Sequence, residues 1–333
     1  MIFIENEGHT NPKLNLALEE YALRNFSSKT DYLLFYINEP SIIIGRSQNT
    51  LEEINQDYVE KNNIHIVRRI SGGGAVYHDF GNLNFSFITN HDVKSLNNFK
   101  KFTAPVISAL SKIGVEAELK GRNDILVNDK KISGTAQFST GKRMISHGTL
   151  LFNTDLGEVA NALQVKMSKI ISKGHKSVRS RVANISEFIN KPLQIEDFRA
   201  LLLRGLYEEM EPFETYHLTA EEWKAVYSLK EEKYDSWDWN YGRSPKFNIQ
   251  QSKRFPVGEI DVRMFVEKGY LTELKIFGDF FGQEPLENLE NILIGVKYDK
   301  EEISKKLNGV KIEAYFGNVS TSQFIELLFS IDS

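Results

Sequence analysis

The sequence predicts an α+β fold with a mixed β-sheet, flanking helices and a small second domain. Two observations lead to this prediction. Expected strands come partly in adjacent pairs and partly between helices, whereas a doubly wound fold alternates strands and helices strictly. After a connector rich in tryptophan and tyrosine at 234–247, a hairpin pattern and short helices follow. A length of 333 residues suggests about two domains, and we place them at residues 1–246 and 247–333.

The first helix has clear start signals. Asn11 is a suitable N-cap, and Pro12 suits the first helical position. Apolar stretches and alternating patterns predict the other elements of the first half. Strands are expected at 32–37, 41–44, 64–67 and 82–88, and helices at 52–62 and 99–113.

The second half continues with strands and then with helices. Four short strand-like stretches fill residues 115–152, and residues 195–233 read as largely helical. Alternation from 260 to 266, a turn at Lys268-Gly269 and renewed alternation to 276 predict a β-hairpin. Further helices are expected around 286–293, 300–307 and 321–329.

Composition excludes several classes of function. The 41 Lys and Arg residues against 45 Asp and Glu give a net charge of −4, which offers no basic field for nucleic acid. No run reaches the roughly 20 apolar residues of a membrane span, and residues 1–7 lack a signal-peptide pattern, so we expect a cytoplasmic protein. The chain has no cysteine, which excludes thiolate nucleophiles, protein thioesters, zinc sites with sulfur ligands and iron–sulfur clusters.

A glycine-rich stretch directly follows the strand expected at 64–67. It reads Arg68-Arg69-Ile70-Ser71-Gly72-Gly73-Gly74-Ala75-Val76-Tyr77-His78-Asp79. Three residues without Cβ atoms let a backbone approach an anion and turn its N–H groups toward it, and Arg69 can contact a phosphate or carboxylate in a bidentate manner. The spacing matches neither a Walker loop nor a dinucleotide fingerprint. The alternative is a flexible hairpin turn with two solvated arginines.

A second polar cluster contains Lys131. Asn123 and Asp124 are expected to open one strand, and residues 130–136 form the return strand after an Asn-Asp turn. With a period of two, Lys131, Ser133 and Thr135 would share one face of the return strand. This arrangement indicates a cationic site, and an ordinary solvent-facing lysine is the alternative.

Two further segments are candidates for function. His147 stands just ahead of a buried strand, where a lone histidine is more often structural. Residues 173–182 are rich in cations and small side chains, so they form either a solvated loop or a mobile lid over an anionic intermediate. His65 and His78 lack metal-ligand spacing, and no dedicated metal site is expected.

Taken together, six ordered motifs resemble those of the lipoate–protein ligase family. They are Arg68–Asp79, Gly81-Asn82, Gly121–Asp124, Lys131–Gly134, His147–Leu150 and Ser177–Val182. The resemblance covers about residues 1–245, which would be the catalytic domain. The C-terminal segment is similar to the accessory domain of the long-form enzymes. The implied fold is that of biotin–protein ligases and class II aminoacyl-tRNA synthetases.

The resemblance implies a two-step reaction. The lipoate carboxylate attacks the α-phosphate of ATP, with Mg²⁺ present, to give lipoyl-AMP and pyrophosphate. The amine of a lysine on a carrier domain then takes the lipoyl group. The expected partners are lipoyl domains of 2-oxo acid dehydrogenase E2 subunits or the H protein of glycine cleavage, with neither nucleic acid nor membrane.

The family motifs also imply roles for individual residues. Lys131 matches the central lysine that contacts the carboxylate and the α-phosphate, and Asp124 matches a Mg²⁺ contact. ATP or lipoyl-adenylate binding is implied for Arg69, Ser71, Gly72, Gly73, Gly74, Ala75, Val76, Tyr77, His78, Asn123, Asp124, Lys131, Ser133, His147 and Gly148. The expected lid residues are Lys173, Ser177, Val178, Arg179 and Arg181.

Three alternatives stay open from the sequence. An octanoyl- or lipoyl-transferase of the same superfamily uses a cysteine nucleophile, which this chain lacks. A biotin ligase has a different glycine-loop pattern. A non-enzymatic carrier-binding or RNA-binding module would not need Lys131 together with the complete loop from Arg69 to Tyr77.

Overall fold

The computed structural model describes residues 1–92, 95, 98–163, 182–207, 213–241, 247–267 and 269–330. The chain divides into two compact units, which are considered separately. The first comprises Met1–Ile43, Leu51–Arg68 and Val76–Ser236, and the second comprises Ile44–Thr50, Arg69–Ala75 and Trp237–Ser333. The units are therefore not contiguous in sequence, unlike the two domains predicted above.

The first unit is built on an eight-stranded mixed sheet with the order β11-β1-β2-β6-β10-β9-β8-β7. Strand β1 pairs in parallel with β2 and β11, and the other neighbours are antiparallel. These strands are β1 (Ile2–Ile4), β2 (Tyr32–Ile37), β6 (Asn82–Asn90), β7 (Glu118–Lys120), β8 (Asp124–Val127), β9 (Lys130–Ser139), β10 (Arg143–Leu151) and β11 (Thr215–Tyr216). A three-stranded sheet has the order β4-β3-β5, with β3 (Ser41–Ile44), β4 (His65–Arg68) and β5 (Val76–His78).

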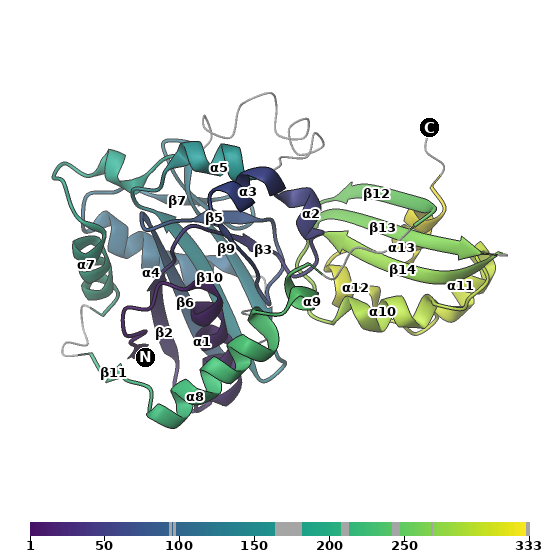
Figure 1. Cartoon of the computed structure of the whole chain (residues 1–333), viewed down its shortest axis with the longest axis horizontal. Coiled ribbons are helices and arrows are strands. Elements are labelled where there is room, and N and C mark those ends of the chain that lie inside the picture. The colour runs from purple at the N-terminus through teal and green to yellow at the C-terminus, as the bar shows by residue number, and fades with distance from the viewer. Residues whose placement is uncertain are drawn as a thin grey trace. The chain divides into compact units, whose positions relative to one another are not determined.

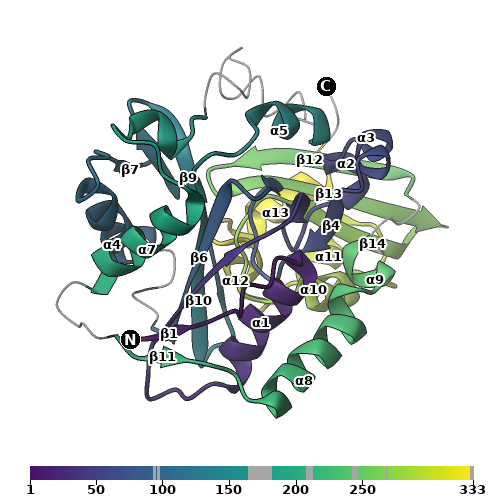
Figure 2. The same cartoon turned by 60° about the vertical axis from the view of Figure 1, so that its left-hand side comes forward.

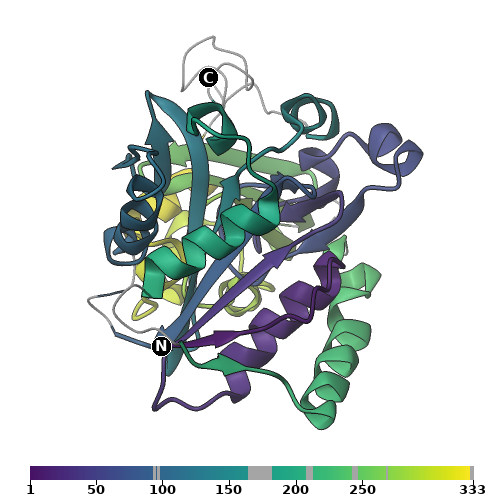
Figure 3. The same ribbon diagram turned by 90° about the vertical axis from the view of Figure 1, so that its left-hand side faces the viewer.

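Helices cover both faces of the large sheet. Helices α4 (Phe99–Ser111) and α7 (Ile195–Tyr207) pack against each other over one face, and α1 (Pro12–Asn25) packs on the other face with α8 (Ala220–Leu229) beside it (Figures 1 and 2). Figure 3 shows α1 in purple alongside α8 in green. The first unit also contains α3 (Gln56–Lys61), α5 (Leu156–Ala162), the 3₁₀ helix Ile185–Phe188 and the π-helix Lys230–Tyr234. The short helix α2 (Thr50–Glu53) begins at the last residue of a segment of the second unit, and α9 (Trp237–Asn240) belongs to the second unit.

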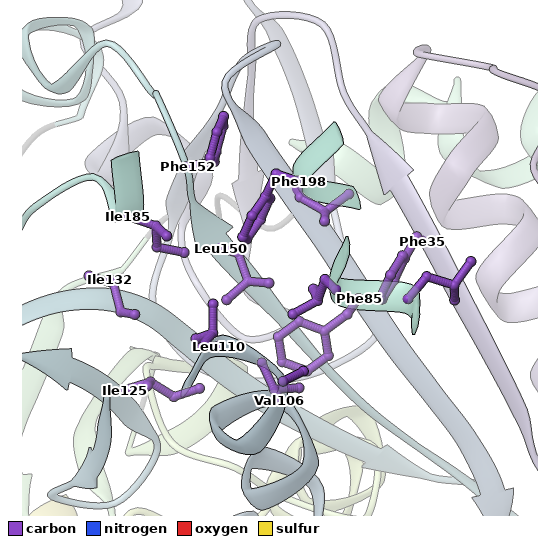
Figure 4. Packing of buried hydrophobic residues seen from close by; sticks show 14 of the residues in the cluster. Phe35, Phe85, Val106, Leu110, Ile125, Ile132, Leu150, Phe152, Ile185 and Phe198 are labelled. Atoms are coloured by element: carbon purple, nitrogen blue, oxygen red, sulfur yellow. The ribbon is translucent and has the colours of Figure 1, made fainter. Parts of the chain in front are cut away.

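The main core lies between the sheet and the α4–α7 pair. Phe85 and Leu150 of the sheet meet Val106 of α4 and Phe198 of α7 there (Figure 4). Asn82, Asn84 and Ser86 of β6 point away from this core, as the alternation predicts, yet they too are buried, because α1 covers that second face. The second face is therefore a buried polar surface.

One predicted helix is wrong in its extent. Residues 52–62 do not form a continuous helix but are divided between α2 and α3. The side chain of Asn55 accepts a hydrogen bond from the Tyr58 N–H and caps α3, and Ile54 forms an isolated bridge with Leu163. An N-cap residue has extended rather than helical backbone angles, so the helix restarts there.

Helix α1 begins as predicted and fixes a buried carboxylate. Asn11 caps the helix through the N–H groups of residues 13 and 14. Glu20 accepts hydrogen bonds of 2.7 Å from Arg24, Lys233 and Tyr234. Burial alone would raise the pKa of Glu20, but the charge and hydrogen bond of Lys233, with the two other donors, outweigh it and lower this pKa. The cluster ties α1 to the π-helix.

The second unit contains an antiparallel sheet of β12 (Ile249–Phe255), β13 (Gly258–Glu267) and β14 (Tyr270–Gly278). The predicted hairpin is confirmed, whereas β12 was missed. The helices are α10 (Leu286–Leu293), α11 (Lys300–Lys306), α12 (Ile312–Phe316) and α13 (Thr321–Leu328). Figure 1 shows them with the sheet, and together they enclose a separate hydrophobic core. Lys268 of the predicted turn lies outside the described residues. Within the part of the chain that is described, no helix is long and apolar enough to cross a membrane.

Candidate active site

Lys131 lies near the start of β9, where the ladder with β8 contains a bulge. The pairing shifts between Ile125 and Leu126, so β9 carries one extra residue at Ile132. Lys131 itself is anchored on its other side, because its carbonyl accepts a hydrogen bond of 3.0 Å from the Ala183 N–H. The bulge therefore sets the direction of the Lys131 side chain.

The predicted common face of Lys131, Ser133 and Thr135 is wrong. One extra residue reverses the alternation of a strand beyond it. Ser133 is fully buried opposite the core residue Ile125. Thr135 is held to Asn123, whose carbonyl accepts hydrogen bonds from its N–H at 3.0 Å and its hydroxyl at 2.9 Å. The Asn123 side chain donates back to the Thr135 carbonyl, so Asn123 fixes the β8–β9 pairing.

Lys131 instead shares a face with Asp124 and Gly134. Its Nζ lies 2.8 Å from Oδ1 of Asp124, and both side chains are about one-third exposed. A Cβ atom placed on Gly134 would lie 2.9 Å from this Nζ and 3.1 Å from Cε. The lysine side chain thus runs across the glycine. The motif Lys131–Gly134 therefore places a cation on the strand and clears the space it needs.

His147 lies within β10, not ahead of a strand as predicted, on the sheet face covered by α1. Its Nδ1 is 2.9 and 3.0 Å from the two carboxylate oxygens of Glu19, and both residues are buried. Sequence reasoning missed Glu19, although a Glu-Glu pair within the apolar face of α1 is a signal for a buried acid. Packing explains why the neighbouring residue 148 is glycine, since a Cβ there would lie 2.6 Å from the Phe85 ring.

Tyr77 and His78 form the end of β5. Burial raises the pKa of Tyr77 well above its usual range, and the nearby charge of Asp79 adds to this effect. Nδ1 of His78 lies 3.0 Å from the side-chain nitrogen of Asn38. Asp79 accepts hydrogen bonds from the N–H groups of Gly81 and Asp155, at 2.9 and 2.8 Å, and so shapes the turn into β6.

In the second unit, the glycine loop is closed by Arg69. Nε of this buried side chain donates to the Ser71 hydroxyl at 3.0 Å, and Nη2 donates to the carbonyls of Gly72 and Gly74 at 2.6 and 2.9 Å. Donors of a planar guanidinium that are committed to three oxygens in one loop hold its shape. Arg69 is thus a brace of the loop, a role that the sequence did not predict.

Two positions of this loop require glycine, one because of close backbone packing and one because of its backbone angle. A Cβ on Gly72 would lie 2.3 Å from the Phe280 carbonyl oxygen, and Gly73 has a φ of +92°. A Cβ on Gly45 would come within 1.9 Å of the Gly73 carbonyl oxygen. The space expected for a ligand at these positions is thus partly filled by the protein's own backbone.

The other predicted residues are placed as follows. Val76 opens β5 and Ala75 precedes it. Lys173, Ser177, Val178, Arg179 and Arg181 of the predicted lid lie outside the described residues. Among the residues with described positions, no group of three or more His, Asp or Glu side chains could hold a metal ion. Asp124 belongs to no such group and is paired with Lys131.

Comparison with known protein families identifies the chain. Residues 11–207 match the lipoyl protein ligase A/B catalytic domain. The chain belongs to the lipoate–protein ligase family. Residues 244–328 match the bacterial lipoate protein ligase C-terminus. Membership of this ligase family confirms the resemblance and the enzyme class predicted from the motifs.

Curated relatives of this ligase match it over nearly its whole length. It is 53% identical over 331 residues to the lipoate-protein ligase LplJ of Bacillus subtilis, with 99% of this chain and 100% of the relative covered. It is 52% identical to lipoate–protein ligase 1 of Staphylococcus aureus, with 98% and 100% covered.

Solved structures of lipoate ligases share the fold. Plasmodium falciparum LipL1 in complex with lipoate gives a TM-score of 0.77 at 28% identity, with 98% of this chain and 97% of that chain covered. A bipartite lipoate protein ligase and its E2 lipoyl domain from Thermoplasma acidophilum gives 0.65 at 33% identity, with 74% and 98% covered. Lipoate-protein ligase A bound with ATP gives a TM-score of 0.61 at 32% identity, with 70% of this chain and 94% of that chain covered. The predicted mixed sheet with flanking helices is confirmed.

Proposed function

We propose that this ligase activates lipoate with ATP and transfers the lipoyl group to a lysine of a carrier domain. The observation that carries the proposal is Lys131, a cation that pairs with Asp124 and whose side chain runs across Gly134. Relatives of nearly full length are named lipoate–protein ligases, and similar structures were solved with lipoate and with ATP.

In the first step, two anions must meet. A carboxylate oxygen of lipoate forms a bond to the α-phosphorus of ATP, and the bond from that phosphorus to the bridging oxygen breaks to release pyrophosphate. A preorganised ammonium offsets the repulsion between the anions and the charge that develops on phosphate. Lys131 supplies it by leaving Asp124 for the substrate oxygens, a change of partner that its partial exposure allows.

In the second step, a carrier lysine attacks the acyl carbon of lipoyl-AMP. The new N–C bond replaces the bond from the acyl carbon to the phosphate oxygen, AMP leaves with that electron pair, and the amine releases a proton. No protein thioester is needed, and the chain has no cysteine that could form one. This argues against the acyl-transferase alternative.

Asp124 suits a role with Mg²⁺. In phosphate-transferring enzymes this ion is usually bound by one or two carboxylates together with substrate phosphates. Asp124 is a single, partly exposed carboxylate that is released when Lys131 changes partner. When bound, Mg²⁺ would neutralise charge on the phosphates, while Asp124 would orient it.

The remaining assignments follow the family. We assign the predicted binding residues from Arg69 to Gly148, except the core-facing Ser133, to ATP or lipoyl-adenylate. We assign residues 1–246 to the catalytic domain and 247–333 to the accessory domain. The carriers are lipoyl domains of E2 subunits or the H protein, and the location is the cytoplasm. The similar ligase solved with an E2 lipoyl domain supports this class of partner.

Two assays test the proposed function. Purified chain with Mg²⁺ should catalyse exchange of pyrophosphate into ATP only when lipoate is added, and biotin should not replace lipoate. With apo carrier present, the carrier mass should increase by one lipoyl group in an ATP-dependent manner. Transfer that proceeds from a lipoylated donor without ATP would contradict the proposal and favour an acyl-transferase.

A further inference from the structure

We infer that the hydroxyl of Thr149 is a second donor beside Lys131 and binds the same oxyanion of the substrate. The inference deepens the proposed function and rests on it for the ligand, an anionic oxygen of the reacting carboxylate or α-phosphate. Its structural part depends only on contacts within β6, β9 and β10 of the first unit. None of the binding roles implied by the family motifs falls on Thr149.

The strand pattern places the Thr149 side chain on the sheet face that carries Lys131. Leu150 of β10 points into the main core (Figure 4), and successive side chains of a strand point to opposite faces. Thr149 therefore points away from that core. The register of the β9–β10 ladder places Gly134 opposite Thr149, and residues opposite each other share a face.

Gly134 is the residue at which Thr149 and Lys131 meet. Its N–H donates to Oγ1 of Thr149 at 3.4 Å. A Cβ atom on the same glycine would lie 2.9 Å from Nζ of Lys131 and 3.9 Å from Oδ1 of Asp124. A glycine has no side chain that could separate the hydroxyl from the ammonium. Thr149, Lys131 and Asp124 are all partly exposed, so this part of the sheet is open to a ligand.

The proton of the Thr149 hydroxyl is available to a ligand. A hydroxyl group has one proton to donate and two lone pairs that accept, and the Gly134 N–H uses a lone pair. Within the described part of the chain, this hydroxyl donates to no acceptor. Asn84, which is opposite Thr149 on β6, has both ends of its amide engaged elsewhere, by the Tyr36 carbonyl and by Asn82.

An ammonium and a hydroxyl proton on one face form a small oxyanion site. Carboxylate and phosphate oxygens accept hydrogen bonds, and such bonds are stronger when the acceptor is charged. Donors that are in place before the reaction need no reorganisation as charge develops on these oxygens. Thr149 thus shares the oxyanion with Lys131, whereas the ionised Asp124 can only accept and is the partner that the oxyanion replaces at Lys131.

The test is kcat/KM for lipoate in the lipoate-dependent pyrophosphate exchange assay. Thr149→Val keeps the shape of the side chain but removes the hydroxyl. It should lower kcat/KM by about tenfold to a hundredfold, as expected for one hydrogen bond to a charged group. Thr149→Ser keeps the hydroxyl and should stay within about fourfold of wild type, the effect of losing one methyl group.

Thr89→Val is the matched control. Thr89 is also partly buried and lies on the neighbouring strand β6, where its hydroxyl donates to the Asn90 carbonyl at 3.3 Å. It pairs with Met144, near the other end of β10. This substitution removes a hydroxyl from the same sheet without touching the oxyanion site, so kcat/KM for lipoate should not change.

A double-mutant cycle shows whether Thr149 and Lys131 bind the same oxyanion. In a Lys131→Ala background the oxyanion loses its charged partner and is no longer held against the hydroxyl. Thr149→Val should therefore lower the rate much less in this background than in wild type. Equal fold-losses in the two backgrounds overturn the inference, because Thr149 would then act independently of Lys131.

Two further outcomes overturn the inference and leave the proposed function intact. One is active wild-type protein with an unchanged kcat/KM in Thr149→Val, and the other is an equal loss in Thr149→Ser and Thr149→Val. Thr149→Ala also lacks the hydroxyl, so it replaces Thr149→Val if the valine variant does not fold, and it should show the same loss. A folded wild-type chain without lipoate-dependent exchange instead overturns the proposed function, and with it the ligand assigned to Thr149.

Discussion

Lys131 and Arg69 are both assigned to the adenylate, yet the structure holds them in different ways. Among the described residues, Lys131 has one charged partner, Asp124, and about one-third of its side chain is exposed. Arg69 is buried and donates to three oxygens of its own loop. Lys131 can therefore exchange Asp124 for a ligand at a small cost in free energy. Arg69 cannot leave its partners without breaking the hydrogen bonds that hold the loop.

The difference shows that a charge in a motif can serve chemistry or shape. A partly exposed ion pair contributes little to stability, so Lys131 should affect the reaction far more than the fold. Buried hydrogen bonds to carbonyls contribute mainly to the folded state. Arg69 should therefore affect the fold first and ATP binding as a consequence.

The largest effect is expected for Lys131→Ala. Loss of one preorganised charge-stabilising group should lower the rate of lipoyl-AMP formation by about 10²–10³-fold, with little change in unfolding. Single-turnover adenylation is the measurement. Lys130→Ala is the matched control. The side chain of this neighbouring lysine is about half exposed, and its Nζ lies as far as 3.9 Å from Oε2 of Glu187. Equal rates of lipoyl-AMP formation for wild type and Lys131→Ala would contradict the assignment of Lys131 to the reaction.

Arg69→Lys should mainly destabilise the protein. One ammonium cannot reproduce the fork that reaches Ser71, Gly72 and Gly74, so we expect a loss of about 1–3 kcal/mol in the free energy of unfolding, measured by urea titration. Arg199→Lys, at a partly exposed pair with Glu5, should lose less than about 1 kcal/mol. If Arg69→Lys is as stable as wild type but binds ATP poorly, Arg69 is a direct ligand contact.

Gly134→Ala tests whether the space beside Lys131 matters. The new methyl group would lie 2.9 Å from Nζ and must displace the end of a flexible side chain. We expect adenylation to fall by about tenfold, an effect of about 1.4 kcal/mol on the barrier, with the melting temperature nearly unchanged. In a Lys131→Ala background the same substitution should have no further effect, and an additive loss would show that Gly134 acts on something else.

Glu20→Gln should have the smallest effect and a defined pH dependence. Like Arg69, Glu20 is a buried group with three partners, so its removal should lower stability by about 1 kcal/mol at pH 7. The pKa of Glu20 is lowered in the folded protein from its ordinary value of 4.5. Its contribution is therefore complete above about pH 4.5 and is lost as the pH falls through the folded-state pKa. Denaturation of both proteins across this range should show the two curves converging in acid.

Much of the fold could be predicted because its signals are local. Asn11 and Pro12 start α1 as expected, and α10 has the predicted bounds. The alternation of β6 predicted which of its side chains face the core. The ordered motifs identified the family, since they recur as contiguous residues. Such features depend on neighbours within a few positions along the chain.

The arrangement of the site was decided by the tertiary structure. The bulge at Ile132 places the side chains of Lys131 and Ser133 on opposite faces of β9. It depends on the register of β9 with β8. Glu19 meets His147 across 128 positions of sequence, and Asn38 meets His78 across 40. A local pattern states which residues are polar but not which partner each will find. Only packing brings distant polar groups together, and because burial removes water, each group must take the partner that packing provides.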